Sequence, residues 1–110
     1  MARHEVQYDI TVATSEAAST PIPWDGVDGG HFDVTSGSTA TITWYVSKDG
    51  TTYKVAKDEN GSDVTSLNLS TTYDFVIPTT LNGRGGWLKA VATSNAGVIA
   101  VGKKRSAGPG

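Results

Sequence analysis

The residues best suited to acid–base chemistry in this chain are a histidine and the carboxylates beside it. His31 stands between Asp28 and Asp33, and serine is abundant. The chain therefore contains the residue types of a site in which a histidine–carboxylate pair activates a serine hydroxyl as nucleophile. Such a site also needs a turn that presents the serine, and the chain has no Gly-x-Ser-x-Gly elbow. The other histidine, His4, lies apart near the beginning of the chain. The sequence therefore favours no catalytic residue, and we predict that the protein is not an enzyme.

Carboxylates gather in two segments that are predicted to be loops, and a loop rich in carboxylates is a candidate metal site. The two groups are Asp25, Asp28 and Asp33, then Asp58, Glu59 and Asp63. Calcium favours such oxygen-rich loops, but neither group follows the twelve-residue calcium pattern that ends in glutamate. Aspartate followed by glycine is also ordinary turn chemistry, and no facing pair stands out for glycoside hydrolysis. Cysteine is absent, which excludes thiolate ligands and disulfides. We predict no metal and no cofactor, and calcium binding by the loops stays open.

Aromatic side chains could form a platform that stacks on a sugar or a base. Trp44 belongs to an alternating apolar face and is expected in the core, whereas Trp24 lies among prolines and glycines and is expected to be exposed. Arg84 sits in a glycine-rich segment similar to a short RNA-binding tract. However, the formal net charge of the chain is -2, which gives no basic field to attract nucleic acid or an anionic membrane.

The elements that must carry these residues are all predicted to be strands. Apolar and polar residues alternate cleanly over residues 5–13 and 39–47, which is typical of half-buried strands, and no segment has a helical period. Six further short strands are expected at residues 31–35, 51–56, 64–69, 72–77, 87–93 and 98–103. About eight short strands separated by turn residues predict an all-β fold, an antiparallel β-sandwich with jelly-roll or Greek-key wiring.

Two hairpins are predicted within this arrangement. The dipeptide Asp49-Gly50 is a strong hairpin signal, and a two-residue loop there pairs Val46 with Tyr53 and Trp44 with Val55. A four-residue loop preserves the same parity. Residues 87–93 and 98–103 are expected to form a closing hairpin. Both faces of that pair are fairly apolar, so it is either central or covered by a partner.

The length of 110 residues corresponds to one domain. We expect an N-terminal tail at residues 1–4, a single domain at residues 5–103 and a flexible tail at residues 104–110. Within the domain, residues 20–30 are expected to form an extended arm or loop rich in proline and glycine. The chain shows no secretory signal and no apolar run of the roughly 20 residues that span a bilayer, so a protein made in the cytoplasm is expected.

Two segments offer residues for docking onto another protein. The arm carries Ile22 and Trp24 as apolar anchors on a backbone that its prolines hold extended. If these anchors dock, replacing Trp24 by alanine weakens binding and leaves the fold intact. The basic residues Lys103, Lys104 and Arg105 could tether the chain to an acidic surface. We predict these five residues as the partner-binding set.

One stretch of the sequence resembles a known class of proteins. Residues 41–53, which read TITWYVSKDGTTY, are similar to small structural proteins of tailed bacteriophages, and so are residues 22–24 and 87–92. The resemblance covers residues 5–103 and implies a capsid decoration (cement) protein more than a tail protein. The same stretch also resembles discoidin-like and carbohydrate-binding sandwiches, which are usually longer and secreted.

The resulting expectation is a non-enzymatic virion structural protein. It would decorate and stabilise a phage capsid by bridging neighbouring subunits of the major capsid protein, as a homo-oligomer, trimer or dimer. It would be made in the host cytoplasm and reside on the capsid surface of the virion. The alternative is a carbohydrate-binding β-sandwich module on a phage or cell surface. The number of copies in the oligomer and the face that docks are left open by the sequence.

Overall fold

Strands make up nearly all the regular structure that the described residues form. The structure is a computed structural model that describes residues 3–36, 40–67, 74–81, 85–94 and 96–105. The strands are β1 (Arg3–Val12), β2 (Ile22–Pro23), β3 (Val27–Ser36), β4 (Thr41–Ser47), β5 (Lys54–Val55), β6 (Thr65–Leu67), β7 (Asp74–Val76), β8 (Trp87–Ala92) and β9 (Ala96–Arg105). A single 3-10 turn, η1 (Thr79–Leu81), is the one helical element of that part. The predicted all-β class is therefore confirmed, and no helix among the described residues has the length and apolar character needed to cross a membrane.

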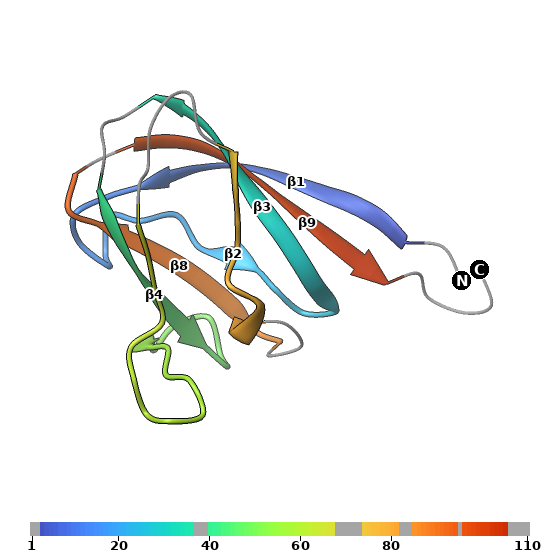
Figure 1. The fold of residues 1–110 in the computed structure, drawn as a ribbon. Coiled ribbons are helices and arrows are strands. Elements are labelled where there is room, and N and C mark those ends of the chain that lie inside the picture. Colours follow the sequence, from blue (N-terminus) through green and yellow to red (C-terminus); the bar gives the residue numbers. More distant parts are fainter. Residues whose placement is uncertain (1–2, 37–39, 68–73, 82–84, 95, 106–110) are drawn as a thin grey trace.

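The strands form two antiparallel sheets. Sheet A has the order β1-β9-β3-β7, and sheet B has the order β2-β8-β4-β5, with β6 also paired to β4. Figure 1 shows β1, β9 and β3 running side by side, with β4 and β8 in a separate layer. The chain changes sheet at most of its connections, so strands that follow one another in sequence mostly lie in different sheets.

A single apolar core joins the two sheets. Phe32 of sheet A lies against Trp44 of sheet B, with ring centroids 5.2 Å apart and ring planes inclined by 39°. Both residues are fully buried, as the alternation in their strands predicts for Trp44. Other buried members come from both sheets and from the connections: Ile10, Val12, Ile22, Trp24, Val34, Ile42, Ile77, Leu81 and Leu88.

The expected closing hairpin is wrong. β8 lies between β2 and β4 in sheet B, whereas β9 lies between β1 and β3 in sheet A. The short connection after Ala92 therefore passes from one sheet to the other instead of turning back within one sheet. Of the two explanations expected for their apolar character, a central position or a covering partner, the first applies, because each strand is central in its own sheet.

The predicted register of the hairpin at Asp49-Gly50 is also wrong, by one residue. The ladder pairs Val46 with Lys54 and Tyr45 with Val55. The backbone N–H of Ala56 donates to the carbonyl of Trp44 at 2.8 Å, and Ala56 is fully buried. A one-residue slip moves every side chain to the opposite face, so Val55 joins Tyr45 on the face away from the core.

Candidate functional site

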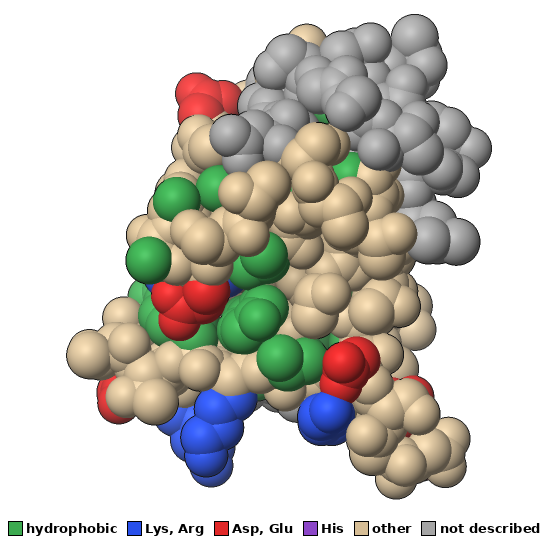
Figure 2. All heavy atoms as spheres, turned by 90° about the vertical axis from the view of Figure 1, so that its left-hand side faces the viewer, with side chains coloured by type: hydrophobic (Ala, Val, Ile, Leu, Met, Phe, Trp, Pro, Cys, Tyr) green, Lys and Arg blue, Asp and Glu red, His purple; other side chains and the backbone are tan. Residues whose placement is uncertain are grey.

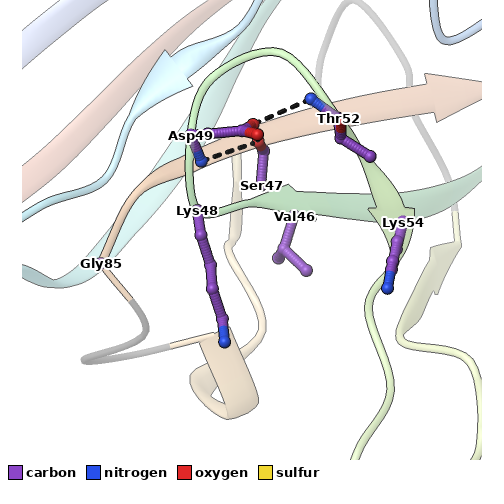
Figure 3. Close-up of a pocket in the computed structure, with 7 residues that line it drawn as sticks. All are labelled: Val46, Ser47, Lys48, Asp49, Thr52, Lys54 and Gly85. Atoms are coloured by element: carbon purple, nitrogen blue, oxygen red, sulfur yellow. Dashed lines mark hydrogen bonds between the residues drawn. The ribbon is translucent and has the colours of Figure 1, made fainter.

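The loop between β4 and β5 borders an open groove of about 480 Å³. Figure 3 shows the groove, with Val46 at its centre and the side chains of Lys48 and Lys54 extending to the same side of the loop. Ser47, Asp49, Thr52 and Gly85 complete the lining. The groove thus combines an apolar floor, a polar wall and two cations.

A dense set of hydrogen bonds holds the polar wall. The hydroxyl of Ser47 donates to Asp49 Oδ1 at 2.9 Å and accepts the backbone N–H of Gly50 at 2.9 Å. The same carboxylate oxygen accepts the backbone N–H groups of Thr51 at 2.8 Å and Thr52 at 2.9 Å. These bonds, first from Thr52, then from Thr51 and Ser47, lower the pKa of Asp49 below its ordinary value of 3.8. The wall therefore carries a fixed negative charge at neutral pH.

This network explains why the hairpin does not form a two-residue turn. Ser47 and Asp49 bind the N–H groups of the residues that follow them, which offers the backbone an alternative to ladder pairing. Gly50 adopts a φ of +79°, which suits such a curled segment. The ladder consequently resumes only at Lys54.

Two glycines bring β8 and the segment before it close to this loop. A Cβ on Gly86 would lie 2.1 Å from the carbonyl oxygen of Ser47, and a Cβ on Gly50 would lie 3.3 Å from the ring of Trp87. The chain thus approaches the loop so closely that the backbone itself forms one side of the groove.

The two cations of the groove are exposed and form no ion pair within the part of the chain that the structure describes. Two unpaired ammonium groups beside an apolar floor suit an acidic partner group, because a carboxylate can approach them without displacing an existing partner. By contrast, Lys57 already pairs with Asp63 across the next turn. The predicted register pairs Val46 with Tyr53 and so puts Lys54 on the opposite face of the hairpin, which is why the sequence did not indicate the groove. The observed register pairs Val46 with Lys54.

A second notable cluster lies on the outer face of sheet B. Lys89 is only 9% exposed, and its Nζ lies 3.3 Å from Glu16 Oε2, 3.1 Å from the Glu16 carbonyl and 4.2 Å from the centroid of the Tyr53 ring. Burial, followed by the negative charges of Glu16 and Asp49, raises the pKa of Tyr53. Tyr45 pairs with Lys89 across the sheet, and Trp87 lies two residues before it on the same strand. Three half-buried aromatic residues therefore share this face.

Figure 2 shows the side of the molecule along which β4 runs. Hydrophobic side chains gather there around carboxylates, and basic side chains lie along the lower border. The sequence pointed to Trp24 and Trp44 and missed the aromatic residues on the outer face of sheet B, Trp87 among them. Trp87 lies two residues from Lys89, on the strand face opposite the one that carries Leu88 and Ala90. The alternation of side chains along the strand could therefore have indicated that Trp87 lies on the outer face.

The structure buries the two apolar anchors predicted for docking. Ile22 and Trp24 are both 0% exposed, so the expected exposure of Trp24 is wrong. The Trp24 indole N–H donates to the Leu81 carbonyl at 2.8 Å, and its backbone N–H donates to the Gly86 carbonyl at 2.7 Å. Ile22 and Pro23 of the expected arm form an edge strand of sheet B, as the prolines predict, but the apolar side chains of Ile22 and Trp24 point into the core of their own chain. Residues 27–30, expected to belong to the arm, instead begin strand β3 of sheet A.

The basic residues predicted to begin a flexible tail lie in a strand. Within β9 the ladder pairs Lys103, Lys104 and Arg105 with Glu5, His4 and Arg3. The ordered strand pair thus extends past both expected limits of the domain, at residues 5 and 103. Residues 106–110 of the expected tail lie outside the described residues.

The second acidic segment forms a turn, whereas Asp28 and Asp33 of the first lie in strand β3 instead of the expected loop. Asp58 accepts the backbone N–H groups of Asn60 at 2.8 Å and Ser62 at 3.0 Å, and Asp63 pairs with Lys57. Among the described residues, no three histidine or acidic side chains gather as a metal site would require. His31 lies half-buried in β3, in the strand position expected for it.

Comparison of the chain with models of known families, with curated proteins and with solved structures finds no match.

Proposed function

We propose that this chain is a non-enzymatic structural protein that decorates a bacteriophage capsid and joins neighbouring subunits of the major capsid protein. The observation that carries the proposal is the order of strand pairing. β1 pairs with β9, β2 with β8, β3 with β7, and β4 with β5 and β6. Each strand from the first half of the chain thus pairs with one from the second half, counted inward from the two ends.

That order is the one obtained by winding a long antiparallel hairpin into two facing sheets. The additional pairs β3–β9 and β4–β8 then complete each sheet. We infer a jelly-roll arrangement from this order, an architecture that recurs in viral capsid domains and in lectins. It supports the role implied by the resemblance of residues 41–53 to phage structural proteins, since those residues form β4 and the loop of the groove.

The groove supplies a contact of suitable chemistry for a protein partner. Lys48 and Lys54, which pair with no acidic group among the described residues, favour acidic groups of a partner. An open site on a loop held by hydrogen bonds also suits a surface contact better than the enclosure of a small substrate. A protein that binds only the assembled shell stabilises that shell by mass action, without any catalytic residue.

The direct test mixes the purified protein with intact and with emptied capsids of a tailed phage whose genome encodes it. We expect saturable, stoichiometric binding and a higher melting temperature of the decorated shell. The variant Lys48→Glu/Lys54→Glu should weaken binding about tenfold or more, since two favourable charges become repulsive. The matched control Lys57→Glu alters a lysine that already has a partner, outside the groove, and should leave binding nearly unchanged. Absence of capsid binding by the unaltered protein contradicts the proposal.

Carbohydrate binding is the second candidate, and the outer face of sheet B is the observation that favours it. Tyr45, Tyr53 and Trp87 lie on that face beside Lys89, and aromatic rings stack on sugars. However, Lys89 already covers the Tyr53 ring and Gly50 packs against Trp87, so parts of these rings have partners within the chain. Binding to a glycan array that is lost in Tyr45→Ala, without capsid binding, favours this candidate over decoration.

A further inference from the structure

The outer edge of β1 has backbone groups that no described residue pairs. β1 is an outer strand of sheet A, and among the described strands its one partner is β9. At Thr11 the outward backbone groups are satisfied, because its N–H donates to Thr20 Oγ1 at 2.9 Å and its carbonyl accepts the Thr20 N–H at 3.0 Å. Backbone groups of alternate residues point to the same side, so those of Gln7 and Asp9 also point outward. Both residues are exposed, and in the described part of the chain neither forms a hydrogen bond on that side.

The other outer strands are short or carry residues that discourage pairing. β2 has two residues and one of them is Pro23, which lacks an N–H. β5 also has two residues and includes the exposed Lys54, while β6 and β7 have three each. Short edges, prolines and lysines are the usual protections against pairing between molecules. β1, with ten residues and no proline, lacks these protections.

We propose that a second copy of this chain occupies this edge, with the two β1 strands antiparallel about a two-fold axis at Val6. In that register Glu5 is opposite Gln7 of the second copy and Arg3 is opposite its Asp9, so residues of opposite charge take opposing register positions at both ends of the pairing. Moving the axis to Gln7 sets Asp9 opposite Glu5, a pair of like charges, and registers farther along meet Thr11, whose outward groups Thr20 already occupies. The two four-stranded sheets then join into one continuous sheet of eight strands.

This dimer goes beyond the proposed function, since it forms between free copies and requires no capsid. Sedimentation velocity over a dilution series should show a reversible monomer–dimer equilibrium. Asp9→Arg alone, and Arg3→Asp alone, should each weaken the dimer about tenfold or more, because the symmetric interface contains each charge pair twice. The double variant Arg3→Asp/Asp9→Arg should restore the dimer. Asp33→Arg makes the same charge change at an exposed position of β3, away from the edge, and should leave it unchanged.

Gln7→Pro provides an independent test, because it removes an outward N–H and leaves the ladder to β9 intact. We expect this variant to be monomeric with an unchanged far-ultraviolet circular dichroism spectrum. If it fails to fold, the charge exchange still decides the question. A protein that stays monomeric up to about 1 mM, or a dimer that withstands Asp9→Arg as well as it withstands Asp33→Arg, overturns the proposal.

Discussion

Gly86 has almost no room for a side chain. A Cβ there would lie 2.1 Å from the Ser47 carbonyl oxygen, and the residue has a φ of +68°. Gly61 has a similar φ of +80° but nothing within 4 Å of the same point. We expect Gly61→Ala to lower the free energy of unfolding by about 1–2 kcal/mol through backbone strain alone. Gly86→Ala should cost clearly more, since the backbone of β4 must also move, and urea unfolding of both variants measures the difference. Equal losses contradict this account of the contact.

Asp49 makes the stability of the loop depend on pH. Its pKa is lowered in the folded protein by hydrogen bonds from Thr52, Thr51 and Ser47, so ionisation favours the folded state. This contribution is fully present above the unfolded pKa of about 4 and is lost as pH falls through the lower folded pKa. Thermal melts of the protein and of Asp49→Asn from about pH 7 to about pH 3 should therefore differ most at the neutral end. A constant difference across that range means that the charge of Asp49 is unimportant.

Trp24 is expected to stabilise the domain rather than a complex. Its side chain is 0% exposed and its indole N–H donates to the Leu81 carbonyl. Trp24→Ala should lower the free energy of unfolding by about 3–5 kcal/mol, as expected for a large side chain removed from a core. Trp24→Phe keeps most of the ring but leaves the carbonyl without its donor, and a smaller loss of about 1–3 kcal/mol is expected. Chemical denaturation checks both values, and an unchanged midpoint for Trp24→Ala would restore the docking interpretation.

At the scale of elements, the connection from β1 to β2 depends on one buried hydroxyl. Ser19 is 4% exposed, and its Oγ accepts the Ala13 N–H at 3.1 Å and donates to the Ser15 carbonyl at 2.9 Å. Ser19→Ala leaves a buried N–H unpaired and should cost about 1–3 kcal/mol. Ser15→Ala removes an exposed acceptor of the Ala18 N–H and should cost less than about 1 kcal/mol. Hydrogen exchange at Ala13 should quicken in the first variant only.

The strands themselves could be predicted from local pattern, whereas their partners could not. Alternation at residues 5–13 and 39–47 reports which side of a strand is apolar, and β1 and β4 follow it. The same signal does not say which sheet a strand joins, so the predicted hairpin of residues 87–93 and 98–103 is wrong. The sequence did not predict the groove between β4 and β5 for a related reason. Hydrogen bonds of Ser47 and Asp49 displaced the register, and a one-residue shift exchanges the two faces of β5. Burial of Trp24 likewise depends on Leu81 and Gly86, which are distant in sequence.

For the whole molecule, the order of pairing predicts slow folding. β1 and β9, from opposite ends of the chain, form a ladder of ten residue pairs, and β3 also pairs with β9. Long loops must close before such contacts form, so refolding in milliseconds to seconds is expected. Stopped-flow fluorescence measures the rate, and a single phase that matches the recovery of circular dichroism is expected from one shared core. Refolding within microseconds contradicts this expectation.

The pairing of Arg3 with Arg105 has a practical consequence for protein engineering. The two ends of the described chain leave the fold at one corner, next to each other, as Figure 1 shows for the ends of β1 and β9. A domain with adjacent ends can be inserted into a surface loop of a larger host protein without separating the two ends of that loop. It can likewise be closed into a covalent ring by a short linker and reopened elsewhere, for example at the exposed turn around Gly61. Two different proteins fused to the two ends of the chain would be held side by side at this corner.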